Sequence, residues 1–181
     1  MSKLKVKNQT GVVLFICLVM LLLLTLLGVS SIQTTSLEQV MARNSVDSNL
    51  AFQAAESALL DGENFVQGLV STNAFDAAGA NVGGLYDDAG PGNNPNWLSL
   101  DWTGANGFRA AETAITGVFS QPMYIVERVT VVVPQTDVLN LDNIGQDAGL
   151  GGTQIFRVTA RGDGGTANAR AMVQSTFGRQ F

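Results

Sequence analysis

Residues 12–32 read VVLFICLVMLLLLTLLGVSSI and contain no charged side chain. A helix needs about 20 consecutive apolar residues to cross the hydrocarbon core of a bilayer. The stretch is therefore long enough to span a membrane as a single helix. Lys3, Lys5 and Lys7, the only lysines of the chain, all precede it. Because basic residues that flank a membrane segment stay on the cytoplasmic side, residues 1–10 are predicted to be cytoplasmic.

Apolar residues continue at helical spacing beyond residue 32. Intervals of three, four and seven residues place them on one stripe of a helix. These residues are Leu37, Val40, Met41, Ala51, Ala54, Ala55, Ala58, Leu59, Phe65, Val66 and Leu69. No proline occurs before Pro91, so nothing interrupts the pattern. The sequence predicts a nearly continuous helix from about Val12 to about Val70, whose first half is apolar all round and whose second half packs on a domain.

Gly28 lies in the apolar half of this predicted helix. A residue without a side chain lets another helix approach closely. Glycine also weakens a helix locally, so a hinge is the alternative. We favour packing, together with the membrane interface, as the role of this position.

The second half of the chain reads as loops and strands. Residues 73–107 are rich in Gly, Asn, Asp and Pro, which predicts a long surface loop. Strands are predicted at Met123–Val133, Gln154–Arg161 and Ala169–Phe177, where apolar and polar residues alternate. The sequence GDGGTAN at 162–168 predicts a turn that joins the last two strands into an antiparallel hairpin. A helix followed by an antiparallel sheet gives an α+β fold class.

Composition excludes several classes of function. The chain has no histidine, and Cys17, its single cysteine, lies inside the apolar run, so an intrachain disulfide is impossible. Residues 12–181 carry seven arginines, no lysine and 15 acidic residues, a formal charge of −8. Without a basic stripe to neutralise phosphates, we expect no nucleic-acid binding. Without a nucleophile elbow, a phosphate loop or a metal-ligand cluster, we expect no enzyme activity, no cofactor and no bound metal.

Both ends of the chain resemble one protein family. Residues 9–59, and in particular Leu50–Glu56 with the sequence LAFQAAE, are similar to the N-terminal region of PilX-type minor pilins. Tyr124–Glu127 and Arg157–Gly162 are similar to its C-terminal part. The resemblance covers about two-thirds of the chain. It implies the type IV pilin fold, in which a long N-terminal helix packs on a C-terminal antiparallel sheet.

The resemblance also implies a processing event and a division of the chain. Type IV pilins are cut after a glycine by the prepilin peptidase, which methylates the new N-terminus; here the cut falls between Gly11 and Val12. Most pilins have Phe where this chain has Val12, which is also apolar. The expected segments are a cleaved leader (1–11), a transmembrane and filament-core helix (12–32), an amphipathic helix half (33–72), a variable loop region (73–122) and a sheet region (123–181).

Ile16 departs from the pattern of the major pilins. They carry a glutamate at the fifth mature position, thought to pair with the terminal amine of a neighbouring subunit. A buried carboxylate without a partner costs several kcal/mol. The first subunit of a filament has nothing ahead of it, so an isoleucine suits a subunit at the tip. The alternative is that Ile16 is one more lipid-facing residue of a divergent pilin.

By resemblance, the expected function is a minor pilin that primes type IV pilus assembly. The chain would wait in the bacterial inner membrane as a single-pass protein and then enter the extracellular pilus. Its expected partners are other minor pilins, the major pilin, the prepilin peptidase and a large tip adhesin. The pilus would support twitching motility, adhesion or DNA uptake. Two alternatives are a minor pseudopilin of a type II secretion system and a single-pass, membrane-anchored periplasmic binding module.

Three further features are weighed as possible sites. Trp97 and Trp102 either anchor a loop to the core or contact a partner, since tryptophan is enriched at interfaces. Arg161-Gly162-Asp163 spells a tripeptide of cell-adhesion ligands, but such short matches arise often by chance. Acidic residues in loops 73–107 and 134–153 hint at calcium without the EF-hand spacing, so we favour turn formation for them. These residues are Asp87, Asp88, Asp137, Asp142 and Asp147.

Overall fold

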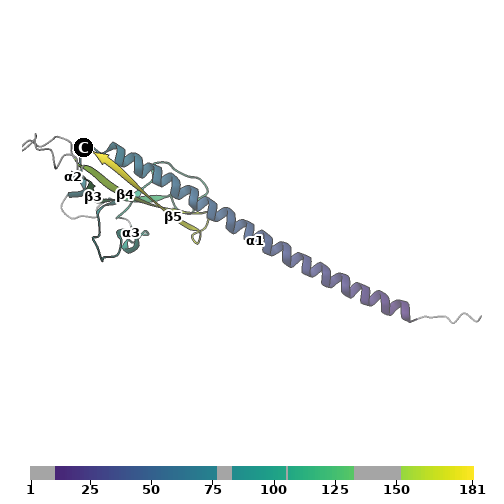
Figure 1. Ribbon diagram of the computed structural model, residues 1–181. Helices are drawn as coiled ribbons and strands as arrows, with labels where there is room; N and C mark the ends of the chain where they lie inside the picture. Colours follow the sequence, from purple (N-terminus) through teal and green to yellow (C-terminus); the bar gives the residue numbers. More distant parts are fainter. Residues whose placement is uncertain (1–10, 77–82, 105, 133–151) are drawn as a thin grey trace, which may run out of the picture. The chain divides into compact units, whose positions relative to one another are not determined.

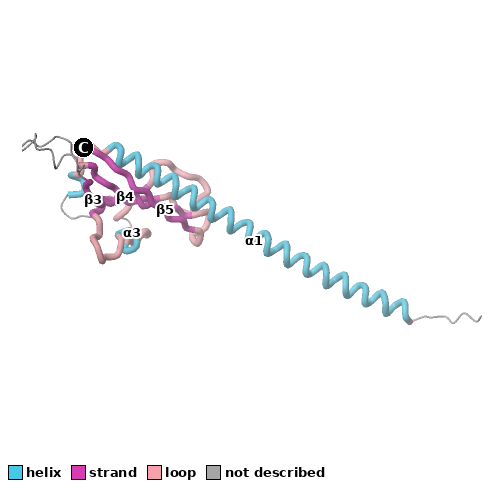
Figure 2. The backbone as a smooth tube through the Cα atoms, in the orientation of Figure 1, coloured by secondary structure: helices cyan, strands magenta, loops and turns pink. Residues whose placement is uncertain are grey.

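A computed structural model describes residues 11–76, 83–104, 106–132 and 152–181. The chain forms two units, Met1–Ser45 and Val46–Phe181. Helix α1 spans Val12–Gly68, 57 residues without a break, and its residues belong to both units (Figures 1 and 2). The predicted continuous helix is therefore confirmed, and it ends two residues before the expected Val70.

The C-terminal end of α1 is explained by local chemistry. Glycine is a poor helix former, and the last helical residue is Gly68. The Leu69 N–H donates to the Val66 carbonyl at 3.3 Å, which tightens the final turn. Arg179 Nη1 donates to the same carbonyl at 2.6 Å, so a residue near the end of the chain satisfies a helix terminus.

One five-stranded sheet follows the helix. Its strands are β1 (Leu85–Asp87), β2 (Arg109–Ala110), β3 (Met123–Val132), β4 (Thr153–Asp163) and β5 (Arg170–Gln180). The order is β1-β3-β4-β5, with β2 also paired to β3 (Figure 1). The β3–β4 and β4–β5 pairs are antiparallel, as the sequence predicts, and β4 and β5 extend up to three residues beyond the predicted bounds. The α+β fold class is confirmed.

Several short elements lie where the sequence predicts only loop. They are α2 (Asn73–Asp76), β1, α3 (Asn96–Ser99) and β2. β1 pairs with β3 in parallel, which makes the sheet mixed rather than purely antiparallel. With three and two residues, β1 and β2 are too short to show an alternating pattern. Their pairing depends on the neighbouring strand rather than on local sequence.

One face of the sheet packs on the second half of α1. The core there joins Ala58 and Val66 of the helix to Tyr124, Val126 and other sheet residues. The remaining buried members are Leu69, Phe75, Leu85, Phe156, Val158 and Ala160. In β4, Phe156, Val158 and Ala160 are completely buried on one face, as the alternation of apolar and polar residues in Gln154–Arg161 predicts.

The contact between α1 and β4 is unusually close. A Cβ added at Gly162 would lie 2.3 Å from Ala55 N and 2.4 Å from Ala51 O, so only glycine fits there. On the helix side, Ala51, Ala54 and Ala55 are completely buried. Small residues on both elements therefore let the helix backbone rest directly on the strand.

The opposite face of the sheet is covered by the chain around α3. A second core joins Met123 and Ile125 of β3 to Tyr86 and Trp102, with Trp97 and others partly buried against it. Alternate β3 residues thus enter two different cores, because successive side chains point to opposite faces.

Gly162→Ala should destabilise the second unit by about 1–3 kcal/mol, the usual cost of overpacking a core. Tryptophan fluorescence of the detergent-solubilised chain during heating would report a lower Tm. Gly68→Ala is the matched control, because a Cβ added there meets no atom within 4 Å. Equal melting of the two variants would contradict the close contact.

Candidate assembly and processing site

The helix begins at the predicted processing point. Gly11 is exposed and immediately precedes α1, and its carbonyl accepts the first helical hydrogen bond from the Phe15 N–H at 3.3 Å. The Gly11–Val12 peptide bond therefore marks the boundary between α1 and the chain before it. Residues 1–10, which include the rest of the expected leader, lie outside the described residues.

The first 21 residues of α1 present apolar side chains on all sides. At 1.5 Å per residue they extend about 31 Å, close to the thickness of a bilayer core. Within the described residues, α1 is the one helix long and apolar enough to cross a membrane. It is therefore a candidate membrane anchor. Ile16 is 51% exposed, like its neighbours, so its side chain is available to lipid or to another helix.

The threonine in this part of the helix forms its hydrogen bond within the helix. The Thr25 hydroxyl donates to the Leu22 carbonyl at 2.8 Å, which removes its need for water in an apolar setting. Gly28 leaves an open position, because a Cβ added there would meet no atom within 4 Å. These features suit a helix whose partners are lipid chains or similar helices, and the assembly roles of Ile16 and Gly28 stay predictions.

Asp47 fastens the β4–β5 turn to α1. Its Oδ1 accepts the N–H groups of Gly165 and Thr166, and the Thr166 hydroxyl donates to its Oδ2. The hydrogen bond from the Thr166 hydroxyl is the largest influence and lowers the pKa of the Asp47 carboxyl below its ordinary value of 3.8. Desolvation opposes this shift, and the N–H groups of Gly165 and Thr166 add to it. Sequence reasoning missed this contact because the partners lie more than a hundred residues apart.

The two tryptophans anchor the α3 region to the sheet. Trp102 is 8% exposed, stacks on Phe108 with ring centroids 6.3 Å apart, and donates through Nε1 to the Trp97 carbonyl at 3.0 Å. Trp97 is half-buried. The anchoring interpretation therefore describes their position in the fold, whereas contact of either residue with a partner stays a prediction.

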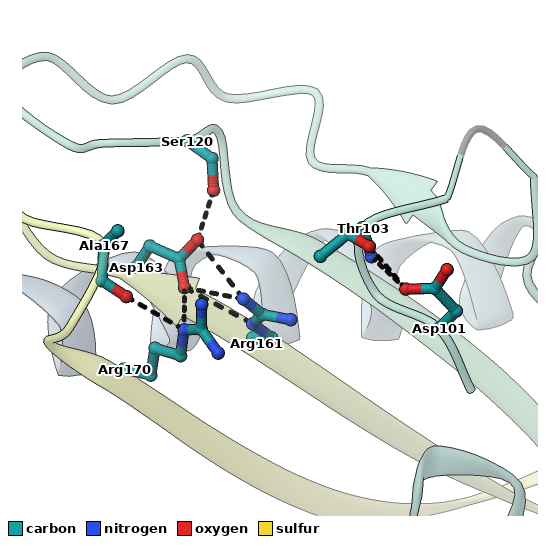
Figure 3. Close-up of polar contacts among 7 residues, drawn as sticks. All are labelled: Asp101, Thr103, Ser120, Arg161, Asp163, Ala167 and Arg170. Atoms are coloured by element: carbon teal, nitrogen blue, oxygen red, sulfur yellow. Dashed lines mark hydrogen bonds and ion pairs between the residues drawn. The ribbon is translucent and has the colours of Figure 1, made fainter. Parts of the chain in front are cut away.

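Arg161-Gly162-Asp163 lies at the end of β4 and not in the turn where the sequence places it. Asp163 is 4% exposed and Arg161 is 7% exposed. The Asp163 carboxylate accepts from Ser120 Oγ at 2.5 Å and from Arg161 Nη2 at 3.1 Å, and Arg170 Nε lies 3.7 Å away (Figure 3). The side chains that an adhesion ligand must offer are thus engaged inside the protein.

Glu127 is a buried carboxylate that sequence reasoning did not single out. Its side chain is completely buried; Oε1 accepts from Asn96 Nδ2 at 2.9 Å, and Oε2 lies 3.6 Å from Arg157 Nη1. Asn96 also donates to the Asp87 carbonyl at 2.7 Å, so it ties α3 to both β1 and β3. The sequence signal that could have found it is strand alternation. Glu127 lies two residues after Ile125 and four after Met123, so its side chain points to the same buried face.

The acidic pair expected to form turns is engaged in ion pairs. Asp87 Oδ1 lies 2.8 Å from Arg128 Nε, and Asp88 Oδ1 lies 3.6 Å from Arg157 Nη1. Among the described residues there is no group of three or more acidic, cysteine or histidine side chains placed to hold a metal ion. The segment with Asp137, Asp142 and Asp147, and residues 133–151 generally, lie outside the described residues.

A long N-terminal helix, apolar at first and then packed on a sheet, is the α+β architecture of a type IV pilin. Residues 10–60 match the family model described as PilX N-terminal, and residues 62–179 match the model described as Type IV pilus assembly protein PilX C-term. The chain therefore belongs to the PilX family of type IV pilus assembly proteins. No curated protein and no solved structure matches it.

Asp47→Asn should lower the Tm at neutral pH, because a neutral amide accepts these donors less well than a carboxylate. With a folded-state pKa below the unfolded one, the carboxylate stabilises the fold above about pH 4 and loses this effect as the pH falls through the folded pKa. The Tm difference between the wild type and Asp47→Asn should therefore become smaller as the pH falls.

Thermal melts at pH 7 and at stepwise lower pH would measure that difference. Glu56→Gln, which neutralises an exposed carboxylate on the same helix, should leave the Tm nearly unchanged. A difference between wild type and Asp47→Asn that stays constant with pH would contradict the assignment.

Proposed function

We propose that this PilX-family protein is a minor pilin that primes type IV pilus assembly and occupies a place at or near the tip. The observation that carries the proposal is Ile16 at the fifth position after the expected cleavage site. Its partners would be other minor pilins, the major pilin, the prepilin peptidase and a tip adhesin.

The N-terminal part of α1 supports this role because it suits two environments. Its surface is apolar on all sides, so it is stable in a bilayer. In lipid alone, apolar helices have no hydrophobic reason to associate, and small residues such as Gly28 promote close packing instead. The same surface can thus leave lipid and join a bundle of similar helices. Before assembly the chain would lie in the inner membrane with residues 1–10 in the cytoplasm, following the positive-inside rule.

The absence of a carboxylate at position 16 supports placement at the tip. In a filament core, a glutamate is stable only beside a cation, such as the terminal amine of an adjacent subunit. A subunit at the tip has no subunit ahead of it and would bury such a charge alone. Its own terminal amine remains free to meet the glutamate of the next subunit. Isoleucine therefore removes a cost at the one place in the filament where the partner is missing.

Ile16→Glu should reduce the preference for the tip, because the added carboxylate can then pair with the amine of a subunit ahead. Immunogold labelling of pili would show the variant along the shaft, whereas the wild type stays at filament ends. Ile16→Leu is the control and should label like wild type. Unchanged tip occupancy of the glutamate variant would speak against the proposal, as would normal numbers of surface pili after deletion of the gene.

Replacement of Gly11 tests the processing step separately. Gly11→Leu places a bulky side chain beside the scissile bond and should leave the leader attached. Mass spectrometry of the N-terminus would then detect the uncut precursor, while wild type should begin at a methylated Val12. Gly28→Leu alters a glycine inside the helix and should be cleaved normally. An uncut wild-type chain in purified pili would exclude the proposed processing.

A further inference from the structure

The charges of this acidic chain are strongly segregated. Residues 153–181 carry four arginines and one acidic side chain, Asp163, for a formal charge of +3. Residues 12–152 carry three arginines and 14 acidic side chains, for a formal charge of −11. The basic part forms strands β4 and β5 and their turn, and residues 164–180 contain no acidic side chain. The β4–β5 hairpin is therefore a basic element on an acidic protein.

A surface hollow of about 300 Å³ lies over this hairpin, on the sheet face opposite α1. Trp97, Leu98 and Trp102 line it from the α3 side, and Arg161, Arg170 and Met172 line it from the sheet. Leu98 is 59% exposed and Met172 is 43% exposed. The hollow thus combines apolar and aromatic walls with two guanidinium groups.

Among the residues that the structure describes, Arg161 and Arg170 share a single acidic partner, Asp163. Arg161 Nε and Nη2 donate to Asp163, and Arg170 Nε lies 3.7 Å from the same carboxylate and donates to the Ala167 carbonyl at 3.0 Å (Figure 3). The side chain of Arg170 is 55% exposed, and its two terminal nitrogens have no hydrogen-bond partner among the described residues. One positive charge therefore remains uncompensated at the edge of the hollow.

Strand β5 is an edge strand of the sheet. Within the described part of the chain its only strand neighbour is β4, so its other edge offers backbone N–H and C=O groups to an added strand. From Arg170 to Thr176 the exposed side chains alternate with half-buried ones. Arg170 and Met172, which line the hollow, belong to the exposed set. A strand added beside β5 would therefore place every second side chain next to the hollow.

We propose that β5 and the hollow receive an extended acidic segment of a partner polypeptide, which adds as a strand to the sheet. Backbone hydrogen bonds to β5 would supply affinity, and alternate side chains would supply specificity. A carboxylate on that segment pairs with Arg170, and an apolar side chain two residues away, on the same face of the added strand, contacts Leu98 and Met172. Charge complementarity favours this occupant, because the hairpin is basic where the rest of the protein is acidic. The inference does not depend on where the subunit sits in the pilus.

The probe is a fluorescein-labelled nine-residue peptide in which glutamate and valine take turns at every second position, with threonine between them, so that one strand face carries both; binding is measured by fluorescence anisotropy with the full chain in detergent micelles. A lysine–valine peptide should not bind. N-methylation of every second residue removes backbone donors and should weaken binding about tenfold if a strand is added. Failure of the glutamate peptide to bind, or equal binding of all three peptides, would overturn the proposal.

Two pairs of variants locate the binding surface. Arg170→Glu should weaken binding of the glutamate peptide about tenfold or more, whereas Arg43→Glu makes the same charge change on an exposed part of α1 and should not. Leu98→Ala should weaken it less strongly, and Leu60→Ala, at a similarly exposed helix residue, should have no effect. Unchanged Tm values would confirm that the variants fold. Equal affinities within each pair would overturn the assignment.

Other polyanions are distinguished in the same assay. A 20-base-pair DNA duplex and vesicles containing phosphatidylglycerol test a nucleic acid and a lipid surface. The proposal expects Arg170→Glu to change the affinity for the glutamate peptide most. Binding of the duplex or the vesicles that exceeds peptide binding and is lost in Arg170→Glu would overturn the proposal in favour of that ligand.

Discussion

The architecture depends on the direct contact between the backbone of α1 and strand β4. Gly162 faces Ala51 and Ala55 with no space for even one added carbon. Such closeness sets the rotation of the helix about its axis, because only its small-residue side can approach the strand. Side chains on the other sides of α1, such as Phe52 and Leu60, are consequently exposed. One narrow stripe therefore decides both what the second unit buries and what it presents to other molecules.

Side-chain hydrogen bonds attach further segments to α1, in addition to the packing of α1 on β4. Asp47 binds the β4–β5 turn, Asp61 accepts from the Thr113 N–H at 3.0 Å, and Arg179 binds the end of α1. On the other sheet face, Asn96 and Glu127 connect α3 to the strands. Each contact joins segments distant in sequence. These few polar side chains thus complete a domain that contains no cysteine and whose sheet is covered on both faces.

The sequence predicted the features that repeat along the chain. The long helix and strands β3–β5 have patterns of many residues, and the hydrophobic effect enforces such patterns wherever they occur. It did not predict β1, β2, α2 and α3, which are too short to show a period, nor the parallel pairing of β1. The partners of Asp47 and Glu127 were missed because only folding brings them together. Gly11, Val12 and Ile16 could be singled out because the roles expected of them are tied to positions in a family pattern rather than to tertiary contacts, and Gly28 because a glycine stands out within an apolar helix.

The bond from Arg179 to the end of α1 has a consequence for the order of folding. The residues that close the core against the helix come long after it in the sequence, since α1 ends at Gly68 whereas β4 begins at Thr153 and β5 at Arg170. Until these strands pack on α1, no surface covers Ala51, Ala54 and Ala55, and native contacts of such long range form late. The helix can therefore form before the sheet that covers it, and the domain completes its structure only when β4 and β5 pack on α1.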